Sequence, residues 1–176
     1  MHCAVAPRRL AVGKVVLAPL VAGYRLGLVA GTTVRSCVVG LGFRGASQAR
    51  VEQAGHEFSR DILPGMLRPI ALERIAWHKA QGDVVVVVSG ALDVYLSPWC
   101  SQHGVELICS ALETRDGTLT GRYRGEQCVG QEKSRRVLAQ YAVGDFPVVY
   151  AYGDTHEDHD LLRIADRRYF RWQELC

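Results

Sequence analysis

The feature that most constrains the fold is a run of five consecutive valines at positions 84–88. A strand with one face in water alternates apolar and polar residues. An uninterrupted apolar run instead indicates a strand buried on both faces, as in a parallel sheet covered by helices. Pro69 stands where the first residue of a helix would lie, ahead of apolar residues at helical spacing over 72–79. A helix that leads into a doubly buried strand favours the α/β class.

The rest of the chain continues the alternation of strands and helices. Asp116 and Gly117 form a hairpin signal between two short apolar runs. The pattern predicts a doubly wound, Rossmann-like parallel sheet over residues 68–176. After the valine strand, we expect strands at 105–112, 119–123, 146–152 and 168–171, and helices at 95–103, 132–141 and 158–165.

Residues 7–67 are expected to form a small helical cap. It comprises an apolar segment at 15–30, a looser segment at 32–45, and a helix at 47–60 with Ser47 as its N-cap. Pro19 and Arg25 interrupt the apolar segment, which falls short of the roughly 20 residues that a membrane span needs. We therefore expect a buried or interfacial helix, with peripheral membrane contact through 15–30.

Composition excludes several classes of protein. The 21 Lys and Arg against 18 Asp and Glu leave a net charge of only +3, and the basic residues are scattered, so no nucleic-acid partner is expected. The six cysteines form no CxxC pair, which favours a reducing, cytoplasmic location. Cys100-x-x-His103 and His156-x-x-His159 are lone pairs without the further ligands that structural zinc requires.

Polar residues gather where the predicted parallel strands end, which is where such sheets bind ligands. The Ser89 hydroxyl and the Gly90 amide can hold a phosphate oxygen, and Lys133 can offer positive charge to a phosphoryl group. Asp154 and Asp158 lie four residues apart, so their carboxylates can face one cation. Taken singly, these residues are common as a capping turn, a solvated lysine and an N-cap, so their order along the chain matters most.

That order resembles the second, third and fourth motifs of the haloacid dehalogenase superfamily. The matching segments are VVVSGALDVYLSPW from Val86, CVGQEKSRR from Cys128 and YAYGDTHEDHDLL from Tyr150. They are similar to the phosphoserine-phosphatase-like branch over residues from about 47 to the end. The apolar N-terminal segment and the closing ADRRYFRW resemble bacterial members of the phosphatidylglycerophosphate phosphatase type.

The resemblance implies a magnesium-dependent phosphatase that acts through an aspartyl-phosphate on a small phosphomonoester or a lipid phosphate. Ser89 and Gly90 would bind the phosphoryl group, Lys133 would offset its charge, Asp154 would hold Mg²⁺, and Asp158 would orient the metal shell. The family's first motif, DxDGT, supplies the nucleophile from a strand in the middle of the sheet. It has no counterpart here, and residues 1–14 contain no aspartate. We therefore expect a missing central strand, no nucleophile and an inactive chain, through either truncation or true loss.

Two alternatives remain open. A non-catalytic pseudophosphatase or interaction domain would also lack the nucleophile. Gly40-x-Gly42-x-x-Gly45 resembles the fingerprint of an NAD- or FAD-binding oxidoreductase, but the strand expected next is broken by Pro64 and Pro69. Thr114–Thr118 reads TRDGT, which imitates the missing motif; its Asp-Gly pair predicts a hairpin turn instead.

Overall fold

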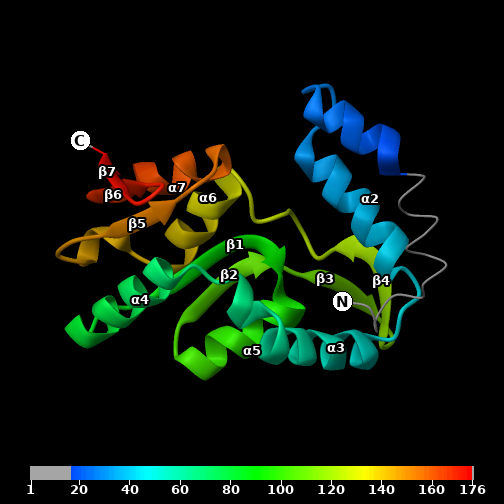
Figure 1. Ribbon diagram of the computed structural model, residues 1–176, viewed down its shortest axis with the longest axis horizontal. Coiled ribbons are helices and arrows are strands. Elements are labelled where there is room, and N and C mark those ends of the chain that lie inside the picture. The colour runs from blue at the N-terminus through cyan, green and yellow to red at the C-terminus, as the bar shows by residue number, and fades with distance from the viewer. Residues whose placement is uncertain (1–16, 176) are drawn as a thin grey trace.

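The computed structural model describes residues 17–175 (Figure 1). Helices and strands alternate along most of the chain, so the α/β class is confirmed. After a helix at residues 17–25, the helical elements are α2 (Gly31–Phe43), α3 (Gln48–Asp61), η1 (Leu63–Met66), α4 (Pro69–Gln81), α5 (Asp93–His103), α6 (Gln131–Gln140), η2 (Val143–Asp145), η3 (His156–Asp158) and α7 (His159–Arg163). The strands are β1 (Val86–Leu92), β2 (Glu106–Ser110), β3 (Leu112–Arg115), β4 (Thr118–Tyr123), β5 (Tyr150–Gly153), β6 (Arg167–Phe170) and β7 (Gln173–Leu175).

The parallel strands form two separate pairs. β1 pairs with β2, and β5 pairs with β6, whose other edge carries β7 in antiparallel orientation. β3 and β4 form an antiparallel hairpin that turns at Asp116 and Gly117, with φ of 51° and 70°. The hairpin prediction is therefore confirmed. Within residues 17–175 no strand joins β1 to β5, which is where the central strand was expected to be missing.

The valine run is less buried than expected. β1 begins at Val86 and continues through Ser89 and Gly90 to Leu92, so Ser89 lies within the strand and does not follow it. Residues 86–91 are only partly buried, and Val84 before the strand is 53% exposed. The expectation of burial on both faces is therefore wrong. The physical reason is that, among the described residues, β1 has a strand neighbour on one edge only.

The segment expected to be looser, 32–45, is largely the regular helix α2. Its β-branched residues and glycines weaken helix propensity, but Val39 and Phe43 are buried against the hairpin in one apolar cluster. Tertiary packing of one face therefore overrides propensity. Gly40 and Gly42 lie inside this helix and follow no strand, which removes the structural basis of the dinucleotide fingerprint. The cluster consists of Val39, Phe43, Val51, Leu92, Leu112 and Leu119.

Helix α3 packs closely on α5. A Cβ added to Gly55 would lie 2.1 Å from the carbonyl oxygen of Val94, so only glycine allows this approach. Ser47 occupies the predicted N-cap position, although its side chain makes no capping hydrogen bond.

The described helices of the proposed cap share apolar clusters with the strands. Residues 7–16 of that region lie outside the described part. A second cluster contains Leu63, Leu96, Trp99, Cys100 and Val105.

The apolar segment at 15–30 is described from residue 17 onward. Leu26 and Leu28, which follow the helix at 17–25, are 73% and 79% exposed. Within residues 17–175 none of the helices is long and apolar enough to cross a bilayer. Peripheral contact of this segment with a membrane stays a prediction.

Strand β5 is shorter than predicted. It begins at Tyr150, whereas the sequence suggested Phe146. Phe146 and Val148 are 40% and 46% exposed, so the apolar run that suggested a longer strand is only partly covered. The C-terminal strand is confirmed as β6 and is followed by a further short strand, β7.

Candidate active site

One cleft of about 750 Å³ receives all five of the predicted site residues. The carboxyl ends of β1 and β5 form part of its wall, and α2 faces them across the opening. The residues brought together there are Ser89, Gly90, Lys133, Asp154 and Asp158.

The innermost polar feature is the ion pair between Lys133 and Asp158. The two side chains are each only 9% exposed, and Lys133 Nζ donates to Asp158 Oδ1. The other oxygen, Oδ2, accepts from the Asp154 and Thr155 amides at 3.1 and 2.9 Å and from Thr155 Oγ1 at 2.9 Å. Burial acts to raise the pKa of Asp158, but the hydrogen bonds from Lys133 and Thr155 outweigh it and hold that pKa below its ordinary value. Asp158 is therefore a fully partnered carboxylate.

The loop after β5 is built around Asp158. A Cβ on Gly153 would lie 2.5 Å from Asp158 Cβ, so glycine permits the loop to close over the carboxylate. Thr155 and Asp158 form a reciprocal capping box at the start of η3. Sequence reasoning missed Thr155, although the T-x-x-D spacing at 155–158 signals such a box.

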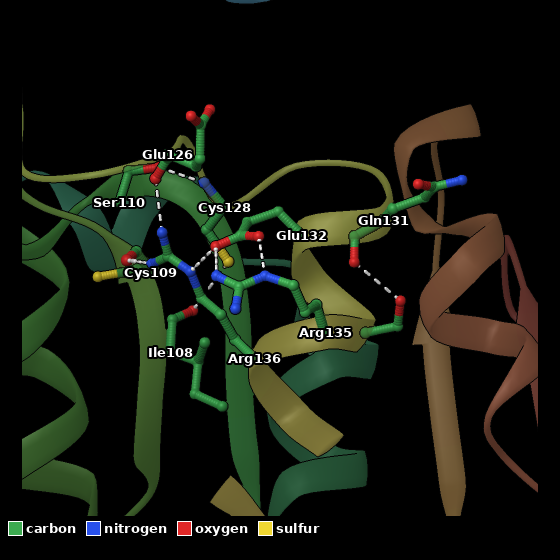
Figure 2. Close-up of polar contacts among 10 residues, drawn as sticks. Ile108, Cys109, Ser110, Glu126, Cys128, Gln131, Glu132, Arg135 and Arg136 are labelled. Carbon is green, nitrogen blue, oxygen red and sulfur yellow. Dashed lines mark hydrogen bonds and ion pairs between the residues drawn. The ribbon is translucent and has the colours of Figure 1, made fainter. Parts of the chain in front are cut away.

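Helix α6 carries Lys133 and is tied to the end of β2 by Arg136 (Figure 2). Arg136 Nη1 donates to the Cys109 carbonyl at 2.7 Å, and Nη2 donates to the Glu126 carbonyl at 2.5 Å. Arg135 and Arg136 also donate hydrogen bonds to the Glu132 carboxylate. These bonds lower the pKa of Glu132 to about 2, and the bond from Arg135 contributes most. Lys133 therefore projects from a helix start that is fixed on the sheet.

Ser89 and Gly90 lie where β1 loses its regular pairing with β2. Ser89 pairs with Cys109, and the register then shifts before Leu92. Ser89 Oγ accepts from the Ala91 amide at 3.1 Å, so its own proton stays available to donate. A Cβ on Gly90 would lie 2.7 Å from Val129 Cγ1, which explains glycine there by close approach of the loop before α6.

Asp154 differs from Asp158 in its surroundings. Its side chain is 45% exposed and pairs with Arg68 Nη2 at 2.8 Å, and the Arg68 side chain is itself 58% exposed. No sequence signal singled out Arg68, which is the N-cap residue of α4. The Asp154 carboxylate is thus held lightly and faces the cleft.

Apolar side chains also line the cleft. They come from α2 and from aromatic residues of α5, β4 and the loop after β6. Arg35, at the start of α2, crosses the opening to Glu157 Oε1 at 2.6 Å and to Gln127 Oε1 at 3.0 Å. Sequence reasoning found none of these residues, because their contacts join parts of the chain about a hundred residues apart. The apolar members are Val34, Val38, Val39, Phe43, Tyr95, Tyr123 and Trp172.

Buried His78 links α4 to β5 behind the cleft. Its side-chain nitrogens contact Asp83 Oδ2 at 2.7 Å and Tyr152 Oη at 2.9 Å. Burial is the main cause that raises the pKa of Tyr152 to about 12. This chain of hydrogen bonds fixes the orientation of β5 just before Gly153.

The donor set fits magnesium only in part. Within residues 17–175 no group of three or more His, Cys, Asp or Glu side chains is arranged to hold a metal. Both Asp158 oxygens are occupied by protein donors, which leaves the Asp154 carboxylate as the accessible hard ligand. Mg²⁺ is often held by one or two carboxylates together with water and substrate phosphate. Asp154 suits that mode of binding.

The sequence and the fold together define the class of protein. A sequence profile described as haloacid dehalogenase-like hydrolase matches residues 13–163, and the chain belongs to this family. Solved phosphoserine phosphatases share its fold at about 20% identity, and its place in the phosphoserine-phosphatase-like branch stays a prediction.

The chain is similar to several known proteins over much of its length. The chain is 30% identical to protein CicA of Caulobacter vibrioides over 133 residues, which are 73% of this chain and 58% of CicA. A protein of unknown function from Bordetella pertussis superposes with a TM-score of 0.78 at 29% identity, covering 90% of this chain and 73% of that one. An unliganded protein from Vibrio cholerae, described as a phosphoserine phosphatase, gives 0.64 at 19% identity, covering 90% and 52%. The chain thus spans somewhat more than half of CicA.

Proposed function

We propose that this chain carries the phosphate- and magnesium-binding part of a phosphomonoester hydrolase site. The observation that supports it most is the convergence of Ser89, Lys133 and Asp154 on one cleft at the carboxyl ends of parallel strands. Ser89 Oγ would donate to a phosphoryl oxygen, and Lys133 would offset its charge. Asp154 would hold Mg²⁺, which when bound neutralises phosphate charge. Asp158 would position Lys133, since its two oxygens are already occupied.

The expected aspartyl-phosphate chemistry needs a carboxylate free to attack phosphorus. Three carboxylates line the cleft among the described residues: Glu157 and Asp158 are paired with Arg35 and Lys133, and Asp154 is the carboxylate that this proposal assigns to Mg²⁺. We therefore infer that the chain, made as written, binds phosphate without turnover. A pseudophosphatase would behave in the same way.

The lining of the cleft supports a proposal for the substrate class. The polar side chains suit a phosphate group, and the apolar side chains of α2 suit a leaving group with apolar surface. A small phosphomonoester fits this division. The acyl chains of a lipid phosphate would lie toward Val38, which is 44% exposed.

The test compares turnover with binding. Purified chain is assayed for p-nitrophenyl phosphate hydrolysis with Mg²⁺, and phosphate binding is followed by calorimetry with and without Mg²⁺. We expect no turnover, and phosphate binding that depends on Mg²⁺ and is lost in Asp154→Asn.

Asp160→Asn is the matched control, because Asp160 pairs with Arg163 and does not line the cleft. It should bind phosphate like the parent chain. Turnover abolished by Asp154→Asn would show that another group supplies the nucleophile. Phosphate binding that ignores both Mg²⁺ and Asp154 would contradict the proposed site.

A further inference from the structure

The turn before α2 carries the most exposed large apolar side chains of the described residues. Leu26 and Leu28 flank Gly27 there and are 73% and 79% exposed. Val21 and Tyr24, on the helix that leads into the turn, are exposed as well. Leucines that are exposed singly are ordinary, whereas a group of exposed apolar side chains marks a contact with a protein partner or a membrane.

Helix α2 adds a further apolar face next to this turn. Val39 and Phe43 form its buried face, which packs on the hairpin. Val38 and Leu41 lie three residues apart, so they share another face, and they are 44% and 37% exposed. Val38 also lines the cleft. Figure 1 shows the start of α2 and the helix before it standing apart from the strands. The α2 apolar surface consists of Val21, Tyr24, Leu26, Leu28, Val38 and Leu41.

The backbone of the turn is already hydrogen-bonded. The Leu26, Gly27 and Leu28 amides donate to carbonyls of the preceding helix at 3.0, 3.0 and 2.9 Å. Gly27 permits this turn because its φ of 73° is a left-handed value that glycine adopts without strain. An unpaired N–H costs most in an apolar layer, where no water can replace its partner. The turn can therefore enter such a layer without leaving these three amides unpaired.

Charge is distributed unevenly along the chain. Residues 1–51 contain seven of the 21 Lys and Arg and none of the 18 Asp and Glu. Residues 52–176 therefore hold the other 14 basic residues together with all 18 acidic ones. Arg25 adjoins Leu26 and is exposed. This asymmetry favours an anionic partner for the part of the chain that carries the α2 apolar surface.

A bilayer that contains anionic lipids matches both properties of this surface. Its headgroups attract basic side chains, and the boundary of its acyl layer accepts apolar ones. A second copy of the chain would cover the apolar side chains but would bring like charges together, which opposes association. Nucleic acid would match the charge through its phosphates but would leave the leucines in water.

We propose that the α2 apolar surface docks the chain on membranes that contain anionic lipids. Leu26 and Leu28 enter the boundary between headgroups and acyl chains, while Arg25 stays at the level of the lipid phosphates. Val38 belongs to both the surface and the cleft, so docking brings the cleft close to the headgroups. Entry of a lipid phosphate into the cleft would rest on the proposed function, whereas the docking itself does not.

Co-sedimentation with vesicles measures the docking. The whole chain is mixed with vesicles of phosphatidylcholine alone, or of phosphatidylcholine with about 30% phosphatidylglycerol, which is anionic. We expect saturable binding to the anionic vesicles that is about tenfold tighter or more than to the neutral ones. Each basic side chain near an anionic surface contributes about a factor of five in affinity. High salt should weaken this preference, because it screens the headgroup charge.

Leu26→Ser with Leu28→Ser tests the apolar part of the surface. Both side chains are exposed, so the double variant should unfold at the temperature of the parent chain. Its affinity for anionic vesicles should fall about tenfold or more, because apolar area no longer leaves water. Met66→Ser with Leu138→Ser is the matched control, since these side chains are 67% and 49% exposed and lie outside the surface. It should bind vesicles like the parent chain.

Arg25→Gln tests the charge. It should weaken binding to anionic vesicles about fivefold and leave the weaker binding to neutral vesicles unchanged. Arg163→Gln is its control, because this arginine lies on α7 with 73% of its side chain exposed. It should bind both kinds of vesicle like the parent chain.

Several outcomes would overturn the docking. They are absence of vesicle binding, equal affinity for neutral and anionic vesicles, and binding to anionic vesicles that persists without Leu26 and Leu28. A dimer of the chain that the double leucine variant dissociates would show that a second copy covers the surface, which also overturns it. Phosphate calorimetry separates this test from the proposed function. Vesicle binding by a chain that binds no phosphate would uphold the docking and contradict only the proposed function.

Discussion

Two ion pairs in the same cleft differ in their exposure to solvent, although their carboxylates, Asp154 and Asp158, lie only four residues apart along the chain. Lys133 and Asp158 have side chains that are each 9% exposed, and every Asp158 oxygen has a protein donor. Arg68 and Asp154 are 58% and 45% exposed and share one contact of 2.8 Å. The buried pair of Lys133 and Asp158 therefore maintains the structure of the site, whereas the exposed Asp154 carboxylate is available to bind a ligand.

The difference follows from solvent. Removal of a charge from water costs several kcal/mol, so a buried ion persists only with close partners that compensate it. An exposed pair pays little of this cost, gains little, and exchanges its partner readily for water or another ion. Asp158 therefore suits a structural role, and Asp154 suits contact with Mg²⁺.

The largest expected effect comes from Asp158→Asn. It leaves the Lys133 ammonium buried without a counter-charge, and breaking a buried pair in this way typically costs about 3 kcal/mol or more of unfolding free energy. Urea denaturation followed by circular dichroism measures the loss. Asp160→Asn removes a more exposed carboxylate, paired with Arg163, and should cost less than about 1 kcal/mol. Equal losses in the two variants would remove the distinction between the pairs.

The second effect is a pH dependence expected of the buried pair. The pKa of Asp158 is lower in the folded protein than its ordinary value, which is about 3.9 in unfolded chains. Its contribution to stability is then fully present above that ordinary value and is lost as the pH falls through the lower, folded pKa. The difference in unfolding free energy between the parent chain and Asp158→Asn should be constant from about pH 5 to 7 and shrink below about pH 4. A gap that instead widens toward acid would contradict the assigned ion pair.

The sequence predicted those site residues that lie at or near the ends of strands and helices. Ser89, Lys133 and Asp154 follow from motif order and strand ends, and the structure gathers them in one cleft. Exposure could not be read in the same way. The sequence does not distinguish the environment of Asp154 from that of Asp158. The folded loop does, because Gly153 and Thr155 enclose the Asp158 carboxylate and leave that of Asp154 exposed.

The fold shows a similar limit. The valine run correctly predicted a strand, because its composition is local information, but its burial depends on a neighbour elsewhere in space. Helix α2 was missed for the converse reason: weak local propensity is overcome when Val39 and Phe43 pack on the hairpin. Hairpin turns such as Asp116-Gly117 were predictable because the constraint lies within two residues.

The smallest stability effect is expected from Arg68→Met, which keeps a long side chain and removes only the charge. Because the pair with Asp154 is solvated, the unfolding free energy should change by less than about 1 kcal/mol.

The same substitution, Arg68→Met, should strengthen Mg²⁺ binding, since a cation that competes for the Asp154 carboxylate is gone. Two unit charges about 4 Å apart interact by roughly 1 kcal/mol in water, so a gain of a few-fold in affinity is the scale to expect. Calorimetric titration with Mg²⁺ at low salt and in 1 M NaCl makes the test sharper: added salt screens the exposed pair, and the parent chain and Arg68→Met should converge. Two results would show that Arg68 and Asp154 also form part of the framework of the site. One is a loss of unfolding free energy in Arg68→Met as large as that in Asp158→Asn, and the other is weaker Mg²⁺ binding in Arg68→Met than in the parent chain.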